Sequence, residues 1–403
     1  MKHIHGGVTA PQGFRAGGIF CGIKKSKKKD LAIIVSDRMC LASGVFTSNK
    51  VQASCVTFNR ERLRSGEAQA VIVNSGNANC LTGKGGYANT VKMAAAAARE
   101  LGVSPKRVLV GSTGVIGVPL PMKRILAGIP VLVKTLSRHG SPEAAHAILT
   151  TDRMAKEAAI EIRIGRRKVR VGAIAKGAGM IHPDMKPHAT MLCYVTTDAV
   201  MTPHALRDAV SRASGKSFNM ISIDADQSTN DMLVVLANGA AQNRIIREKT
   251  KELRLFCRAL DAICLELAKS MVKDAEGATK FVEIGVKNAA SPEDAREVAR
   301  TVASSKLVKC ALFGSDPNWG RIAASVGYSD AAVDPTRLQV KLGSKVVLRN
   351  GARVAQPHSE LGRIFGRKNI RIGIDLGLGR HGATAWTCDL STAYVRINSA
   401  YRT

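Results

Sequence analysis

Short apolar segments alternate with longer amphipathic ones along the first 190 residues. Apolar runs of about four to eight residues bounded by polar ones are typical of buried strands, whereas apolar positions that recur every three or four residues are typical of helices. These patterns predict strands over residues 31–35, 70–73, 107–110 and 169–174, and helices over residues 88–101 and 122–136. This part of the chain is therefore expected to be mixed α/β.

The alternation continues after residue 190. Strands are predicted over residues 190–195, 221–224 and 232–236, a helix is predicted to begin at Thr202-Pro203, and a long amphipathic helix is predicted from about residue 247 to 273. Ser291-Pro-Glu-Asp294 has the pattern of a capping box and opens another helix. A boundary near residues 277–290 would give one domain over residues 1–280 and a smaller α/β domain over residues 281–403, with residues 383–403 returning to the first domain.

Composition indicates a globular protein without membrane segments. The chain has 403 residues, of which 45% are hydrophobic, enough to bury a substantial core. No apolar stretch follows the first lysine, and the longer apolar runs are far too short to span a bilayer. The nine cysteines are an odd number and include no Cys-x-x-Cys pair, which predicts reduced core cysteines. We therefore expect a cytoplasmic protein.

The net charge of +29 is unusual. A basic excess and the run Lys24-Lys-Ser-Lys-Lys-Lys29 would suit nucleic-acid binding. Aromatic residues, however, make up only 4% of the chain, which leaves few rings on which bases could stack. The run is therefore interpreted as a solvated basic loop, and nucleic acid is not an expected partner. A basic field would also speed the approach of anionic substrates.

One segment carries most of the chemical information. It reads Ile174-Ala-Lys176-Gly-Ala-Gly179-Met-Ile-His-Pro-Asp-Met-Lys-Pro-His-Ala189-Thr190 and leads into a predicted strand. A threonine in this place suits a self-cleaving nucleophile, although ordinary β-propensity also explains it. Because a threonine hydroxyl is a weak nucleophile, such enzymes use the chain's own α-amine as the base, and that amine exists only after the preceding peptide bond is cut. His182 or His188 could serve as the base instead, without cleavage.

The segment resembles the cleavage site of the ornithine acetyltransferase family, the bifunctional glutamate N-acetyltransferases of arginine biosynthesis. The family typically reads Lys-Gly-(Ser/Ala)-Gly-Met-Ile-x-Pro-Asn-Met-Ala-Thr-Met-Leu. In this chain Lys186-Pro187-His188 stands between Met185 and Ala189, where the family pattern has no residues. Seven further blocks match in order, at residues 8–14, 74–79, 112–117, 228–231, 276–281, 316–321 and 397–403.

The resemblance implies the fold and the processing of the chain. The family fold is a self-processing α/β sandwich with a second, smaller α/β domain. Cleavage between Ala189 and Thr190 would give an α chain, residues 1–189, and a β chain, residues 190–403. The two chains would stay associated as a dimer of α–β pairs.

The resemblance also assigns roles to single residues. Thr190 would attack the acetyl carbonyl, while Thr113 and Gly114 would form the oxyanion hole. On its own, the sequence predicts only a turn of small residues at Ser112-Thr113-Gly114, whose backbone N–H groups could hold an oxyanion. Substrate binding is implied for Thr150, Lys176, Thr190, Glu276, Asn398 and Thr403.

The chemistry of this set is coherent. Amino-acid substrates are zwitterions, so a site that holds them needs a cation for the carboxylate and an acceptor for the amine, which Lys176 and Glu276 can provide. No metal and no cofactor are expected. An acidic cluster is interpreted as a turn of local hydrogen bonds instead of a cation site, and it comprises Asp224, Asp226, Asn230 and Asp231.

The implied reaction is acetyl transfer from N-acetylornithine to glutamate through an acetyl-threonine, giving ornithine and N-acetylglutamate. No motif separates members that also use acetyl-CoA from those that do not, so acetyl-CoA is a candidate co-substrate. Two alternatives stay open. One is a self-processing amidase or aminopeptidase on the same scaffold, with water as the acyl acceptor, and the other is a basic nucleic-acid-binding protein without catalysis.

Overall fold

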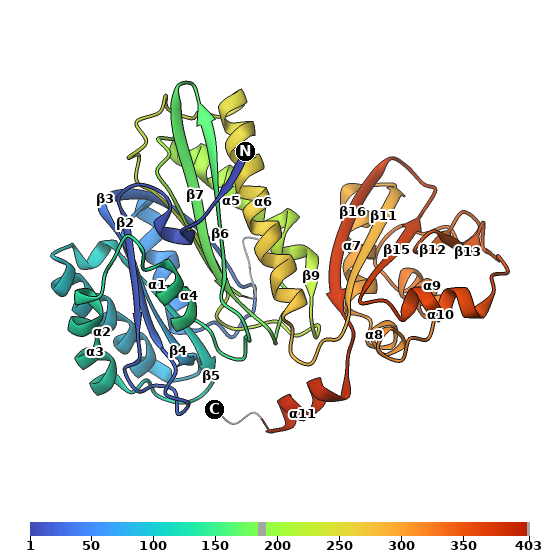
Figure 1. Cartoon of the computed structure of the whole chain (residues 1–403), viewed down its shortest axis with the longest axis horizontal. Coiled ribbons are helices and arrows are strands. Elements are labelled where there is room, and N and C mark those ends of the chain that lie inside the picture. The colour runs from blue at the N-terminus through green and yellow to red at the C-terminus, as the bar shows by residue number, and fades with distance from the viewer. Residues whose placement is uncertain (184–190, 401–403) are drawn as a thin grey trace.

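The computed structural model describes residues 1–183 and 191–400. Two β-sheets organise the chain, each with its own helices (Figure 1), and the expected mixed α/β class with two sheets is confirmed. The larger sheet has the strand order β1-β6-β7-β8-β10-β3-β4-β5, with β2 paired to β3. Its strands are β1 Lys2–Ile4, β2 Phe14–Ile19, β3 Leu31–Phe46, β4 Glu67–Asn77, β5 Val108–Val115, β6 Lys156–Ile164, β7 Arg167–Lys176, β8 Leu192–Thr197 and β10 Met232–Ala237.

The long strand β3 belongs to two layers. Its register with β4 shifts between Val35 and Cys40, and only its second half pairs with β10. The first half therefore lies with β2, β4 and β5, and the second half with β10, β8, β7, β6 and β1. The two layers face each other across one core, because a Cβ atom added to Gly111 of β5 would lie 2.0 Å from the Tyr194 hydroxyl of β8. Strand β3 thus connects the halves of a sandwich.

Helices cover the two outer faces of this sandwich. Helices α1 Ser54–Arg62, α2 Gly83–Leu101, α3 Met122–Lys134 and α4 Ser141–Ala147 pack on the layer of β2 to β5, whereas α5 Pro203–Lys216 and α6 Lys251–Lys273 pack on the other layer. The predicted start at Thr202-Pro203 is confirmed for α5, whereas α6 begins at Lys251 instead of about residue 247. The side-chain oxygens of Thr202 and Thr250 accept hydrogen bonds from Ala205 N and Leu253 N, which fixes where α5 and α6 begin.

The smaller sheet has the strand order β14-β13-β12-β15-β11-β16-β9. Its strands are β9 Ile221–Ser222, β11 Phe281–Ala289, β12 Gln339–Leu342, β13 Lys345–Arg349, β14 Ala352–Arg353, β15 Asn369–Asp375 and β16 His381–Cys388, and the helices that follow β11 are α7 Pro292–Ser304, α8 Lys306–Phe313, α9 Trp319–Gly327, α10 His358–Phe365 and α11 Thr392–Ala400. The capping box at Ser291 and Asp294 is confirmed at the start of α7. Short 3₁₀ helices occupy Gly7–Thr9, Leu63–Ser65, Pro105–Arg107 and Phe218–Met220.

Two segments, β9 and α11, connect the part of the chain built on the larger sheet with the part built on the smaller sheet. The strand expected over residues 221–224 is only β9, two residues long, and it pairs with β16 of the smaller sheet. That residues 383–403 return to the first domain stays a prediction. Residues up to Cys388 stay in β16, because they pair along β11, whereas α11 runs from β16 toward the larger lobe (Figure 1). The division at residue 280 stays a prediction.

The state of the cysteines and the length of the helices can be compared with the expectations drawn from composition. Every cysteine is a free thiol, and seven of the nine are buried, with Cys21 half-buried and Cys310 exposed. In the part of the chain that the structure describes, we find no helix long and apolar enough to cross a membrane.

Candidate active site

The predicted nucleophile segment lies between two adjacent strands. Lys176, the last residue of β7, pairs with Leu192, the first residue of β8. Leu192 also pairs with Met232, the first residue of β10. The chain therefore leaves the larger sheet at the end of β7 and re-enters it at the start of β8. Ala189, Thr190 and the inserted residues 186–188, which belong to this connection, lie outside the described residues.

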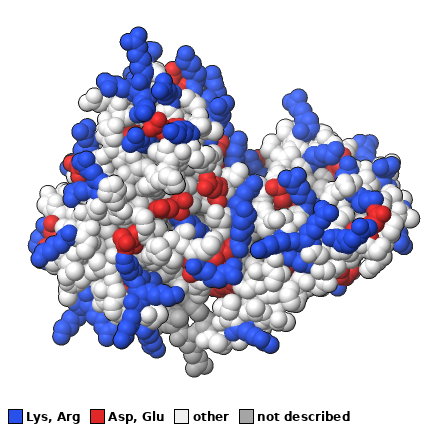
Figure 2. Space-filling view, viewed as in Figure 1, with Lys and Arg blue, Asp and Glu red and all other residues white. Residues whose placement is uncertain are grey.

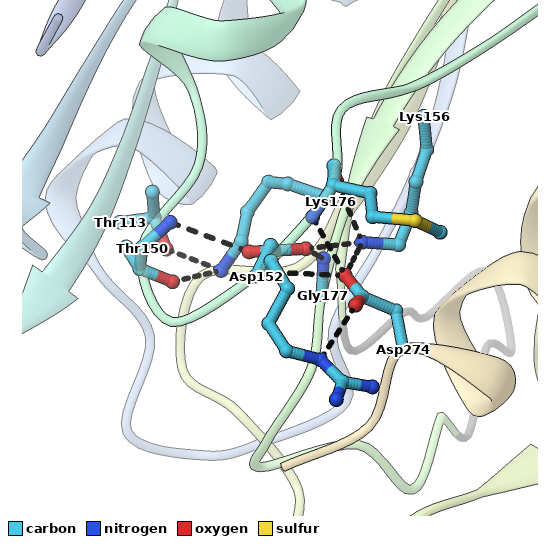
Figure 3. Close-up of polar contacts among 9 residues, drawn as sticks. Thr113, Thr150, Asp152, Lys156, Lys176, Gly177 and Asp274 are labelled. Carbon is cyan, nitrogen blue, oxygen red and sulfur yellow. Dashed lines mark hydrogen bonds and ion pairs between the residues drawn. The ribbon is translucent and has the colours of Figure 1, made fainter. Parts of the chain in front are cut away.

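Lys176 is the centre of a buried polar cluster. Only 8% of the residue is exposed, and its Nζ donates to Thr150 Oγ1 at 2.8 Å and to Thr113 Oγ1 at 3.3 Å (Figure 3). Thr113 comes from β5, in the opposite layer of the sandwich, so the contact spans the two layers. Three residues that the sequence proposed separately are thus in direct contact. Burial lowers the pKa of Lys176, and the charge of Asp152 offsets part of that effect.

Three further charged residues, Asp152, Lys156 and Asp274, form a network next to this cluster, and sequence reasoning missed them. Asp152 accepts hydrogen bonds from Gly177 N at 2.7 Å and from Lys156 Nζ at 2.8 Å. Lys156 in turn reaches Asp274 Oδ2 at 2.6 Å (Figure 3). Burial alone would raise the pKa of Asp152, but the charges of Lys176 and Lys156 outweigh it and lower that pKa. The network fixes the backbone beside Lys176.

The predicted turn at Thr113 and Gly114 is wrong. Strand β5 continues to Val115, so both residues lie within it. Gly114 has φ +132° and lies beside Gly76 of β4, where an added Cβ atom would be 2.3 Å from the Gly76 carbonyl carbon. The parallel register shifts just there, between Gly76 and Asn77. The place needs glycine, and the small-residue pattern reflects this close strand contact.

Glu276 and Asn398 are hydrogen-bonded to each other. Asn398 of α11 donates its Nδ2 to Glu276 Oε2 at 2.8 Å, and Glu276 N donates to Ala178 O at 2.9 Å. The negative charge of Glu276 contributes to the pKa of Lys176, in the raising direction. Asn398 is exposed, and Thr403 lies outside the described residues.

The acidic cluster is more than a local turn. Asp224 accepts from Met180 N at 2.6 Å and from Ile181 N at 2.8 Å, so it holds the segment that precedes the predicted cleavage site. Asn230 donates to Ala78 O and Ser112 O at 2.6 and 2.8 Å. These long-range bonds occur beside the expected local ones, since Asp224 Oδ1 also accepts from Asp226 N at 3.3 Å and Asn230 Oδ1 accepts from Thr229 Oγ1 at 2.6 Å. Sequence spacing gave no signal for them.

A small cavity of about 30 Å³ adjoins Lys176. Its described lining includes Thr113, Lys176, Gly179, Met191, Asn230 and Asp231. No group of three potential metal ligands occurs among the described residues. His182, one of the alternative bases, contacts Ser222 Oγ at 3.0 Å and Arg300 Nη2 at 3.1 Å, and His188 lies outside the described residues.

A buried cation that faces two hydroxyls at a strand edge is typical of an enzyme site. The comparisons identify the enzyme. Residues 15–403 match the model of the ArgJ family, so the chain belongs to that family, and it is a transferase of arginine biosynthesis. The resemblance seen in the sequence is confirmed.

Individual relatives agree with this assignment. The chain is 49% identical over 405 residues to the arginine biosynthesis bifunctional protein ArgJ of Symbiobacterium thermophilum, with all of both chains covered. A crystal structure of the same-named protein from Bacillus halodurans is 37% identical, with a TM-score of 0.50, over 52% of this chain and 98% of that one. A crystal structure of ornithine acetyltransferase complexed with ornithine from Mycobacterium tuberculosis is 40% identical over 45% of this chain and 98% of that one, with a TM-score of 0.43.

Proposed function

We propose that the chain transfers an acetyl group from N-acetylornithine to glutamate at the cluster of Lys176, Thr113 and Thr150. The observation that carries this proposal is the buried Lys176 ammonium, which donates to both threonine hydroxyls beside the start of β8. Family membership supports the reaction, and the contacts of Lys176 support the choice of this cluster as its place. In this proposal the nucleophile is Thr190, which precedes the first residue of β8, Leu192, by two positions in the sequence.

The reaction takes two steps. In the first, the Thr190 hydroxyl oxygen forms a bond to the acetyl carbonyl carbon of N-acetylornithine, the amide C–N bond breaks, and the α-amine of Thr190 passes the hydroxyl proton to the leaving ornithine nitrogen. In the second, the amine of glutamate attacks the acetyl-threonine ester, and the threonine oxygen recovers a proton. N-acetylglutamate leaves, and no cofactor is consumed. The amine has an ordinary pKa of about 7.7–8.0, which suits base work near neutral pH.

The described residues divide the remaining tasks. We assign the oxyanion of each tetrahedral intermediate to Thr113 and Gly114, where hydrogen-bond donors act in a buried site. Lys176 pairs with the carboxylate of the substrate, while Glu276, supported by Asn398, accepts from its ammonium. Thr150 fixes the Lys176 ammonium through the 2.8 Å hydrogen bond. Thr403 is assigned to substrate binding by the family resemblance alone.

Cleavage between Ala189 and Thr190 is part of the proposal, because the α-amine base requires it. The Bacillus halodurans structure supports it indirectly, since 98% of that chain is covered by only 52% of this one, so that chain is about half as long. We further propose that the resulting α and β chains assemble as a dimer of α–β pairs.

Intact-mass analysis of the purified protein, combined with an acetyl-transfer assay, tests the proposal. We expect two fragments of 189 and 214 residues, and transfer that depends on glutamate. Thr190→Ala should stay uncut and inactive, whereas Thr190→Ser keeps a hydroxyl and should cut slowly. An intact chain with full activity would refute the α-amine mechanism. Release of acetate at the same rate without glutamate would assign the chain to the amidases instead.

A further inference from the structure

Helix α11 carries Asn398 but has little packing against the rest of the protein. None of its residues is buried, and Tyr394 is the only one of them that is not exposed. The helix has one charged side chain, Arg396, and Figure 2 shows mostly uncharged surface at the lower middle of the molecule, where α11 lies in Figure 1. Apolar packing and ion pairs therefore contribute little to the position of this helix, and hydrogen bonds have the larger part in fixing it.

Tyr394 makes most of these hydrogen bonds. Its hydroxyl donates to Asp224 Oδ2 at 3.2 Å, and its backbone carbonyl accepts from Asn398 Nδ2 at 3.1 Å. Its backbone N–H donates to Ser391 Oγ, which donates to Gly277 O at 2.6 Å. Burial first, and the charge of Asp224 in addition, raise the pKa of Tyr394, so the phenol stays protonated and can donate. One residue thus connects Asp224 with Asn398.

The Asp224 carboxylate is itself held in place. It is 9% exposed and accepts from Met180 N at 2.6 Å and from Ile181 N at 2.8 Å. Met180 and Ala225 have φ +54° and +67°, a backbone conformation that residues with a Cβ atom rarely adopt. Such strain persists where the surroundings hold it, and it is frequent at functional sites. Asp224 is therefore a fixed point to which the segment after Lys176 and helix α11 are both attached.

These contacts form a closed ring that joins the two charged groups proposed to bind the substrate. Asn398 Nδ2 donates to Glu276 Oε2 at 2.8 Å, and Glu276 N donates to Ala178 O at 2.9 Å, two residues after Lys176. The other half of the ring runs through the Asp224 carboxylate and α11 back to Asn398. The position of the Glu276 carboxylate relative to the segment that carries Lys176 is thus fixed from two sides.

We propose that Tyr394 and Asp224 are positioning residues of the acetyl transfer, which set the separation of Lys176 and Glu276 and thereby the length of the amino acid that the site accepts. The inference rests on the proposed function, which assigns Lys176 to the substrate carboxylate and Glu276 to its ammonium. A substrate whose two charges match this separation forms both ion pairs at once, whereas a homologue with one more methylene must weaken one of them. In an apolar pocket that fits its substrate, one methylene is worth about 10- to 200-fold in discrimination.

Tyr394→Phe tests the inference, because it removes one hydroxyl and leaves the ring in place. The matched control is Tyr328→Phe, since the Tyr328 hydroxyl donates to Ser325 Oγ at 3.2 Å, and Tyr328 follows α9 in the smaller lobe. We would measure kcat and KM of each processed protein for N-acetylornithine and for N-acetyllysine, which is longer by one methylene. Thermal unfolding shows that each variant is folded at the assay temperature.

In Tyr394→Phe, we expect KM for N-acetylornithine to rise at least about threefold with kcat nearly unchanged, since the hydroxyl positions binding groups and touches no reacting atom. The preference in kcat/KM for N-acetylornithine over N-acetyllysine should fall about fivefold. Both quantities should stay constant in Tyr328→Phe. A merely structural hydroxyl would lower the activity with both donors alike, without a change in KM or in the preference. That result, or unchanged constants, overturns the proposal.

Asp224→Asn provides a second test that does not depend on how well the Tyr394 variant folds. The amide keeps only one acceptor oxygen, so the same loss of preference is expected. The double variant should be no worse than the more affected single variant, because both changes remove the same contact, and additive losses of preference would contradict the shared role. A wild type that transfers no acetyl group from N-acetylornithine would refute the proposed function and this inference with it. An active wild type whose constants are unchanged in Tyr394→Phe refutes the positioning role alone.

Discussion

Asp152→Asn removes the negative charge that lies between Lys156 and the backbone of Gly177. In the wild type, Asp152 Oδ1 accepts from Lys156 Nζ at 2.8 Å and from Gly177 N at 2.7 Å, and Oδ2 accepts from Thr150 N at 3.3 Å. An asparagine has only one acceptor oxygen, so one side of the amide must present an NH₂ group to a donor. The variant therefore loses one ion pair and one or more hydrogen bonds.

The cost should be large, because the pair is buried. The side chains of Asp152 and Lys156 are 0% and 1% exposed. Removing one partner of a buried ion pair costs about 3–5 kcal/mol, and we expect about 3 kcal/mol here, since Lys156 keeps Asp274 as a partner at 2.6 Å. The exposed pair of Asp37 and Arg15 offers a matched control, and Asp37→Asn should cost less than about 1 kcal/mol.

The pH dependence gives the sign of the effect. Because the pKa of Asp152 is lowered in the folded protein, its carboxylate stabilises the fold above the ordinary value near about 4, and this stabilisation is lost as the pH falls through the lowered pKa. The difference in unfolding free energy between wild type and variant should therefore be constant near neutral pH and decrease in acid. Urea unfolding followed by circular dichroism between pH 3 and 8 measures it.

The same variant should change the acetyl-transfer reaction. Asp152 raises the pKa of Lys176, so its removal lowers that pKa further. If the Lys176 ammonium pairs with the substrate carboxylate, KM for N-acetylornithine should begin to rise at a lower pH in the variant than in the wild type. A pH profile of KM that does not move, together with an unfolding free energy within about 1 kcal/mol of the wild type, would refute the role of the buried network.

Three further predictions concern other parts of the site. Gly114→Ala should lower both the stability and kcat, because its Cβ atom would lie 2.3 Å from Gly76. The control Gly215→Ala, with open space around it, should be harmless, and equal effects of the two substitutions on thermal unfolding would contradict the argument. Removing residues 398–403 should raise KM for N-acetylornithine or lower kcat without preventing self-cleavage, and unchanged constants would leave substrate binding to Thr150, Lys176 and Glu276. Deleting the inserted residues 186–188, which lie outside the described chain, should preserve cleavage on a denaturing gel; a folded but uncut product would place them in the cleavage machinery.

The sequence predicted helices better than sheets. Helices α5 and α7 begin at the predicted Thr202 and Ser291 caps, because a cap is a local signal that four residues contain. The start of α6, expected at about residue 247, lies at Lys251 after the cap Thr250. Strand β3 was expected to end at Val35, but it continues to Phe46 through the exposed residues 37–39. Its polar middle marks the bend between the two layers, and pairing with β10 and β4, which are distant in sequence, keeps it extended.

In the candidate site, too, residues in local motifs could be predicted and residues distant in sequence could not. Thr113, Thr150 and Lys176 could be proposed from the family motifs, and the structure places them within hydrogen-bond distance. Asp152, Lys156 and Asp274 could not, because single charges separated by up to 122 residues carry no pattern until the fold buries them together. The basic run at residues 24–29 was visible, but its attachment to Asp30 depends on a turn that composition does not reveal.

The larger sheet explains how the chain could be cut at its centre and remain folded. Cleavage at the proposed bond would place β7 and β3 in the α chain and β8 and β10 in the β chain. Because the strand order is β7-β8-β10-β3, the two strands of the β chain would be hydrogen-bonded on both sides to strands of the α chain. The β8 and β10 strands are buried throughout, so their separation would expose both core faces and break two ladders at once. A cut anywhere between Lys176 at the end of β7 and Leu192 at the start of β8 would thus leave this sheet hydrogen-bonded on both sides of the break.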